Sequence, residues 1–228
     1  MYVVKRSLRF VRGALLSYGP SMIKKLFWNR EYSNGKWGFN DNTASDCVYW
    51  YLEKYAKNGS ILDLGCGSGN TANELAFSAY RSYLGVDISK SALDKARKWT
   101  EATGRTDKNS FVQGDFLSYV PTQQFDVILF RESLYHVPLG QIKATVDGFS
   151  KHLTDGGVLI VRLITSENGK SKYRPTAMLG LIDSGFDVLE KRHYNQSGAT
   201  LVVFRPNASD RSADTSRHPE TTSVRGGG

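Results

Sequence analysis

The chain has 228 residues, of which 40% are hydrophobic and 23% charged, a composition typical of a soluble globular domain. Its formal net charge of +8 is carried mainly by residues 1–30, which hold seven basic side chains and no acidic one. Residues 31–204 are formally neutral, which disfavours a nucleic-acid substrate because such binding needs clustered positive charge. Two cysteines make no disulfide framework, and no metal-ligand spacing or membrane-spanning apolar run is present.

Residues 1–25 form a basic segment that begins with the spacing of a short amphipathic helix. Its apolar positions recur at helical spacing with basic residues beside them: Val4, Leu8, Val11 and Leu15 next to Lys5, Arg9 and Arg12. One interpretation is weak contact with an anionic membrane surface, and the other is a poorly ordered leader or a helix packed on the domain. We expect a cytoplasmic protein, either free or peripheral to a membrane.

Residues 26–205 are expected to form one folded domain. It opens with an aromatic-rich segment over residues 26–39, and a helix is predicted over residues 43–55. Residues 206–228 contain hardly any apolar side chains, so this tail is expected to be disordered.

Residues 61–70 read Ile-Leu-Asp-Leu-Gly-Cys-Gly-Ser-Gly-Asn, a short apolar strand with an acidic residue and three alternate glycines. Glycine lets the backbone turn sharply and approach a ligand, and the following helix aims its free N–H groups at that ligand. The pattern predicts a turn that cradles a nucleotide. NAD is disfavoured, because the dinucleotide fingerprint needs a glycine where this chain has Asn70.

Strands and helices alternate along the rest of the domain, which predicts an α/β fold with a parallel, doubly wound sheet. Further strands are expected at residues 83–87, 111–113, 125–130, 158–164, 187–194 and 200–204. Helices are expected over residues 69–78, 89–103 and 138–153, and through Met178 and Ile182. The last two strands are separated by a turn rather than by a helix.

Taken in this order, the motifs resemble those of the class I S-adenosylmethionine-dependent methyltransferases of the small-molecule type, over roughly residues 43–204. The resemblance implies a Rossmann-like seven-stranded sheet with strand order 3-2-1-4-5-7-6, mostly parallel with an antiparallel terminal hairpin. It also implies that residues 26–39 fold over the cofactor pocket, although packing alone would explain their aromatic side chains.

The same resemblance implies S-adenosyl-L-methionine as the cofactor and a role for each motif. Asp63 would hold the glycine loop or the methionine ammonium, Asp87 would accept the two ribose hydroxyls, and Asp115 would lie at the adenine edge. The cofactor-binding residues implied in this way are Asp63, Gly65, Cys66, Gly67, Gly69, Asp87, Ile88, Gly114, Asp115, Phe116 and Arg131.

The turn Arg131-Glu-Ser-Leu-Tyr-His136 follows the fourth strand and is the expected acceptor side, because strand carboxyl ends face the ligand crevice in open α/β sheets. Histidine titrates near neutrality, so His136 is the preferred general base. Glu132 would pair with an amine on the acceptor, and Tyr135 would line its pocket. Each of these three residues also has a plain structural interpretation, as a packed or solvated side chain.

These interpretations predict an enzyme that transfers a methyl group from S-adenosylmethionine to an oxygen or nitrogen of a small-molecule acceptor. Neither a metal nor a nucleic-acid partner is expected. One alternative is a nucleotide-dependent oxidoreductase, which the missing glycine at position 70 and the terminal strand pair oppose. Another is a non-catalytic protein that binds an adenosine ligand and has lost the acceptor site.

Overall fold

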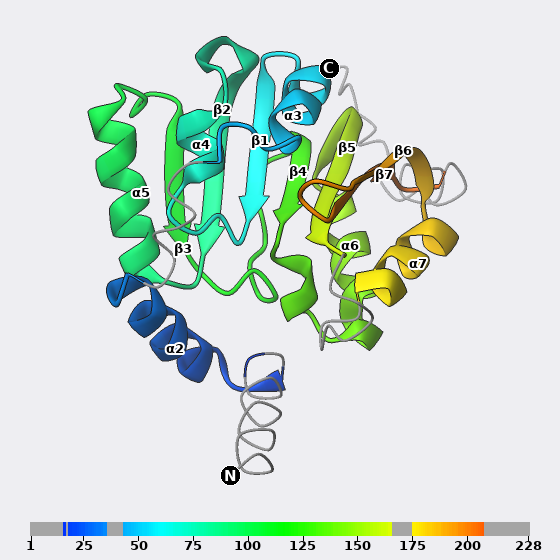
Figure 1. The fold of residues 1–228 in the computed structure, drawn as a ribbon, viewed down its shortest axis with the longest axis horizontal. Helices are drawn as coiled ribbons and strands as arrows, with labels where there is room; N and C mark the ends of the chain where they lie inside the picture. The colour runs from blue at the N-terminus through cyan, green and yellow to red at the C-terminus, as the bar shows by residue number, and fades with distance from the viewer. Residues whose placement is uncertain (1–15, 17, 36–42, 166–174, 208–228) are drawn as a thin grey trace, which may run out of the picture.

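A computed structural model describes residues 16, 18–35, 43–165 and 175–207 (Figure 1). Within them, seven strands form one sheet in the order β3-β2-β1-β4-β5-β7-β6. Strands β1 to β5 run parallel, and β7 is antiparallel to both β5 and β6. The expected fold class and strand order are therefore confirmed. The strands are β1 (Gly59–Leu64), β2 (Tyr80–Asp87), β3 (Asn109–Gln113), β4 (Phe125–Arg131), β5 (Leu153–Ile164), β6 (Asp187–Tyr194) and β7 (Ala199–Arg205).

Helices cover both faces of the sheet, so the central strands are buried on two sides. The described helices are α2 (Ser21–Ser33), α3 (Val48–Ala56), α4 (Asn70–Glu74), α5 (Lys90–Ala102), α6 (Ile142–Ser150) and α7 (Pro175–Gly185). Apolar side chains of α3, α4 and α5 pack on one face, and those of α6 and α7 pack on the other. This sandwich burial explains the continuous apolar runs of β1 and β4.

Helix α3 begins at Val48, so the prediction of a helix from residue 43 is wrong at its start. The backbone N–H and hydroxyl of Thr43 bond to the distant Glu74 instead of continuing a helix. The carboxylate of Asp46 accepts from the backbone N–H of Val48, 3.0 Å away, which satisfies a donor that a helix start leaves open.

Two other helices are shorter than expected. Helix α4 ends at Glu74 because Leu75 is extended, and the chain then forms a 3-10 turn at Phe77–Ala79. The region expected as a helix over residues 138–153 starts with a 3-10 turn at Leu139–Gln141 and continues as α6.

Strand β5 is longer than the predicted 158–164, since pairing with β4 already begins at Leu153. The pairing register shifts before it resumes at Val158, and the left-handed Gly156 lies in this irregular part. Strand β6 matches its predicted range.

Helix α2 crosses the boundary that the sequence analysis drew at residue 25, so the basic segment and the aromatic segment share one helix. The amphipathic pattern of residues 1–15 and nearly all of the tail lie outside the described residues. None of the described helices combines the length and apolar character needed to cross a bilayer.

Candidate active site

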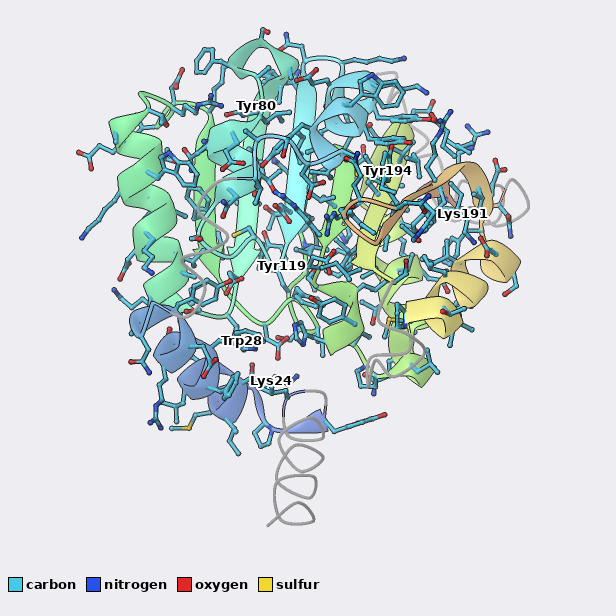
Figure 2. All side chains as sticks on the ribbon, in the orientation of Figure 1. Lys24, Trp28, Tyr80, Tyr119, Lys191 and Tyr194 are labelled. Carbon is cyan, nitrogen blue, oxygen red and sulfur yellow. The ribbon has the colours of Figure 1, made fainter. Side chains whose placement is uncertain are left out.

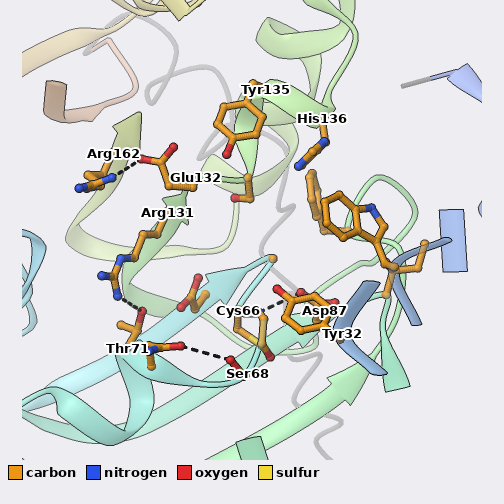
Figure 3. A pocket seen from close by; sticks show the side chains of 18 of the residues that line it. Tyr32, Cys66, Ser68, Thr71, Asp87, Arg131, Glu132, Tyr135, His136 and Arg162 are labelled. Atoms are coloured by element: carbon orange, nitrogen blue, oxygen red, sulfur yellow. Dashed lines mark hydrogen bonds and ion pairs between the residues drawn. The ribbon is translucent and has the colours of Figure 1, made fainter. Parts of the chain in front are cut away.

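A cavity of about 320 Å³ lies at the carboxyl ends of the central parallel strands, closed on one side by α2 (Figure 3). This is where open α/β sheets bind ligands, since the loops after neighbouring strands diverge there. Acidic and basic side chains line it together with aromatic ones, and the groups come from β1, β2, β4, β5 and α2. Of the residues singled out from the sequence, Gly69 and Gly114 do not line the cavity, and the others do.

The glycine loop after β1 forms one wall, and all three glycines adopt the left-handed backbone conformation that glycine favours. A Cβ on Gly65 would lie 2.6 Å from Cβ of Ser133, and one on Gly67 would lie 2.7 Å from the Tyr32 hydroxyl oxygen. At Gly69 the clash would be with Ala96 of α5, at 2.7 Å. Gly65 and Gly67 therefore shape the cavity, whereas Gly69 lets α5 pack closely.

Asp63 is the penultimate residue of strand β1 and is 1% exposed. Its Oδ2 accepts a hydrogen bond of 2.6 Å from the Tyr83 hydroxyl, while Oδ1 has no hydrogen-bond partner among the described residues. Burial raises the pKa of Asp63 to about 6, and the bond from Tyr83 opposes the rise. A buried carboxylate oxygen that lacks a donor is costly, so this atom is suited to a ligand that brings one.

Asp87 ends strand β2 and organises the loop around it. Oδ2 accepts from the backbone N–H of Gly67 at 2.9 Å, and Oδ1 accepts from that of Ser89 at 2.8 Å. Burial raises the pKa of this carboxyl to about 6 despite these bonds. Each oxygen has a second lone pair, so the carboxylate can accept ligand hydroxyls while holding the loop.

Cys66 is a buried residue of the glycine loop and lies between Asp63 and Asp87 in the sequence. Burial, together with Asp87 and Asp63, raises the pKa of its thiol well above the ordinary value. A nucleophilic cysteine needs a lowered pKa, so the thiol is a small packed side chain in a tight turn.

Helix α2 forms the opposite wall and presents Lys24, Trp28 and Tyr32 to the cavity. Figure 2 shows Lys24 and Trp28 on the side of the helix that faces the sheet. Asn29 fastens the helix to the start of α5, where its Oδ1 accepts from the backbone N–H of Ser91 at 3.2 Å. Two residues of the aromatic segment, Trp28 and Tyr32, thus line the cavity.

Asp115 lines the cavity and also contacts residues at the start of α2. Its Oδ2 is 3.2 Å from Nζ of Lys24 and accepts from the Ser21 hydroxyl at 2.9 Å. Both charged side chains are largely buried, which favours the ion pair over separate hydration. Lys24 is a functional candidate that the sequence analysis missed, because nothing near residue 24 points to a partner 91 residues away.

Two arginines and two carboxylates form an ion network along the third wall. Asp46 is 3.1 Å from Nη2 of Arg131 and 3.0 Å from Nη2 of Arg162, and Arg162 also pairs with Glu132. Burial alone would raise the pKa of Asp46, but the two guanidinium groups hold it below its usual value. Asp46 and Arg162 were also missed from the sequence.

The carboxylate of Glu132 is bonded to other residues of the protein, whereas the sequence suggested that it would meet the acceptor. It pairs with Arg162 and accepts from the backbone N–H of Ile164 at 3.2 Å, so its carboxylate is already engaged. Its φ of 54° lies in the left-handed region, a strained conformation for a residue with a Cβ. Burial raises the pKa of Glu132 even though Arg162 opposes the shift.

His136 and Tyr135 lie together on the 3-10 turn Leu134–His136 after β4. The His136 ring is 5.1 Å from the Trp28 ring, nearly perpendicular to it, and 4.8 Å from the Tyr135 ring. In Figure 3, both residues lie across the cavity from Asp87 and Cys66. The expected base therefore sits in an aromatic corner, away from the glycine loop.

Among known families, the methyltransferase-domain family model matches residues 61–157, which run from β1 into β5. This part of the chain is similar to a methyltransferase domain. A sterol 24-C-methyltransferase of Gibberella zeae is 30% identical over 99 residues, which are 43% of this chain and 26% of that protein. A carboxy-S-adenosyl-L-methionine synthase of Desulfotalea psychrophila is 32% identical over 127 residues, 54% of this chain and 51% of that protein. The chain thus spans about a quarter to a half of the length of these relatives.

Solved structures of methyltransferases share the fold of this chain. The DhpI complex with S-adenosylhomocysteine has a TM-score of 0.66 at 18% identity, covering 84% of this chain and 99% of that one. The N-methyltransferase NodS of Bradyrhizobium japonicum, also with S-adenosylhomocysteine, has a TM-score of 0.62 at 19% identity, covering 80% and 97%. At these identities the likeness supports the fold alone.

Proposed function

We propose that this chain binds S-adenosyl-L-methionine and transfers its methyl group to an oxygen or nitrogen of a small molecule. The observation that carries the proposal is the pair of buried carboxylates, Asp63 and Asp87, at the ends of adjacent strands around a glycine loop. The match of residues 61–157 to the methyltransferase-domain family model supports the choice of cofactor.

The residues of the cavity fit this cofactor. The orphaned Oδ1 of Asp63 needs a donor, and the methionine ammonium supplies one with a complementary charge. Asp87 would accept the ribose hydroxyls, and Asp115, with Ile88 and Phe116 beside it in the cavity lining, would lie at the adenine. Glycine at positions 65 and 67 lets the cavity-lining residues Ser133 and Tyr32 pack against the loop, because a Cβ at either position would clash with them.

The chain's part in the reaction is to orient two molecules and to take a proton. When bound, S-adenosylmethionine supplies a methyl group that is already activated on a sulfonium, so positioning lowers most of the barrier. Trp28 and Tyr135 would hold the acceptor by their rings, and α2 would keep water from the cavity. His136 would accept the proton that an acceptor hydroxyl or ammonium must lose.

The test is a calorimetric titration with S-adenosylhomocysteine and with NAD, followed by incubation of methyl-labelled S-adenosylmethionine with a panel of small alcohols, phenols and amines. Binding of the first ligand without the second, together with label in one class of acceptor, supports the proposal. Binding without any label transfer would favour the non-catalytic alternative, and preference for NAD would favour the oxidoreductase.

Replacing Asp87 by Ala is expected to weaken S-adenosylhomocysteine binding by about 1.5 to 3 kcal/mol, the range for hydrogen bonds to a charged group. Isothermal titration calorimetry measures the change. Asp94→Ala on α5 is the control, since the Asp94 side chain is 44% exposed, pairs with neighbouring Lys90 and Arg97, and does not line the cavity. Equal affinity in the Asp87 variant and the control would contradict the ribose assignment.

Cofactor affinity is expected to fall below about pH 6, because Asp63 and Asp87 take up protons there. A bound ammonium lowers the pKa of Asp63, so binding is strongest above the pKa of the free protein and weakens as the pH drops through it. Each such carboxyl contributes at most about tenfold per pH unit. Titrations between about pH 5 and 8 measure the slope, which Asp63→Asn should reduce, and a flat profile would remove the ion-pair argument.

A further inference from the structure

Helix α2 has a second face that the cavity does not use. Its inward side chains line the pocket, whereas Met22 and Leu26 are 71% and 62% exposed, and Ile23 beside them is 41% exposed. Tyr18, just before the helix, is 72% exposed. Figure 1 shows α2 at the margin of the fold, outside the two helical layers that cover the sheet. We define this surface as the outer face: Tyr18, Met22, Ile23, Leu26 and the basic residues Lys25 and Arg30.

The charges on the outer face have one sign. Lys25 and Arg30 are exposed, while the one acidic residue of α2, Glu31, is buried on the other side. Met22, Leu26 and Arg30 follow one another at intervals of four, so the apolar and basic groups share one helical stripe. The face is therefore both apolar and positive.

The combination of apolar and basic side chains indicates which kind of partner can bind the outer face. A second copy of the chain would bring Lys25 and Arg30 of each molecule near the same charges of the other, which is repulsive. Residues 1–15 of the chain itself carry four basic side chains and no acidic one, so they meet the same repulsion. An anionic lipid surface instead accepts the apolar side chains among its acyl chains and pairs its head groups with the basic ones.

We propose that the outer face of α2 docks on an anionic membrane surface. Since the opposite side of the same helix lines the cavity, docking places the pocket wall about one helix diameter, roughly 10 Å, from the lipid. Tyr18 is the kind of amphipathic side chain that settles at a membrane interface. Docking involves lipid alone, so its test is independent of whether the chain transfers methyl groups.

The test is co-sedimentation of the full chain with phosphatidylcholine vesicles that do or do not contain phosphatidylserine. Binding is expected only to the vesicles with phosphatidylserine and to weaken at high salt, which screens the basic side chains. The double variant Met22→Ser/Leu26→Ser should bind roughly tenfold or more weakly, because it loses the apolar area that enters the lipid. Lys25→Glu/Arg30→Glu should lose the preference for phosphatidylserine.

Val120→Ser is the matched control, because Val120 is as exposed as Met22 but lies between β3 and β4, away from the outer face. It should bind vesicles like the parent chain, and all variants should keep its melting temperature because their side chains are exposed. No vesicle binding, or unchanged binding by the Met22/Leu26 variant, would overturn the proposal. A dimer in sedimentation velocity that this variant abolishes, without vesicle binding, would assign the face to a second copy instead.

Discussion

Replacing His136 by Ala is expected to lower kcat by roughly 10²- to 10⁴-fold while leaving S-adenosylhomocysteine affinity near that of the parent chain. His136 lines the cavity across from Asp87, on the side where we propose that the acceptor binds. Removing it would take away the proton acceptor without touching the glycine loop. The measurement is steady-state methyl transfer to an acceptor found in the panel, with calorimetry for the affinity.

The packing of His136 makes a second variant necessary. Its ring is 5.1 Å from that of Trp28, so Ala would also remove a contact that holds α2. His136→Phe keeps a ring in that place but cannot take a proton. Loss of kcat in both variants supports a base, whereas loss in Ala alone would show that the ring acts by packing.

The pH dependence separates the same two roles. A histidine base must be neutral to accept a proton, so kcat of the parent chain is expected to rise with pH as the imidazole loses its proton. The residual activity of His136→Phe should lack this rise. An unchanged profile in that variant would leave His136 as a packing residue.

The fold could be predicted because its signals are local. The burial of β1 and β4 on both faces requires continuous apolar runs, and the glycine loop requires glycine at left-handed positions. Both requirements are visible in a few adjacent residues. Where a boundary was wrong, as at the start of α3, the cause was a contact between Thr43 and Glu74, 31 residues apart.

The residues that line the cavity could be predicted only in part, because some are placed by contacts between residues far apart in the sequence. Residues at or just after the ends of strands, such as Asp63, Asp87 and His136, are placed by the strands themselves. Asp46, Lys24 and Arg162 reach the cavity through partners far away in sequence, and Asp46 and its partner Arg131 are 85 positions apart. No periodicity or motif marks such pairs, so only the folded chain brings them together.

The ion pair between Glu132 and Arg162 changes the role that was expected for Glu132. The sequence suggested a carboxylate that would meet an amine of the acceptor, but Arg162 already neutralises it. Its left-handed backbone aims the side chain back toward β5, where the backbone N–H of Ile164 also donates to it. Glu132 and Arg162 therefore join the turn after β4 to β5, and their main effect should be on stability.

Replacing Arg162 by Ala is accordingly expected to lower the free energy of unfolding by about 3 kcal/mol, the low end of the range for removing one partner of a buried ion pair. The side chain of Arg162 is 9% exposed and bridges Asp46 and Glu132. Asp46 keeps Arg131, so the uncompensated charge would fall on Glu132. Urea unfolding followed by circular dichroism measures the loss.

The sign of the pH dependence identifies which carboxylate is left unpaired. The pKa of Glu132 is already raised by burial, and without Arg162 it should rise further, so its carboxylate opposes folding at neutral pH. Lowering the pH protonates Glu132 in the folded state, and the deficit of Arg162→Ala against the parent chain should shrink. The double variant Arg162→Ala/Glu132→Gln, which carries no charge at either position, should be more stable than Arg162→Ala at neutral pH. A deficit that is independent of pH and is not relieved in the double variant would show that Arg162 stabilises the domain through Asp46 or by packing alone.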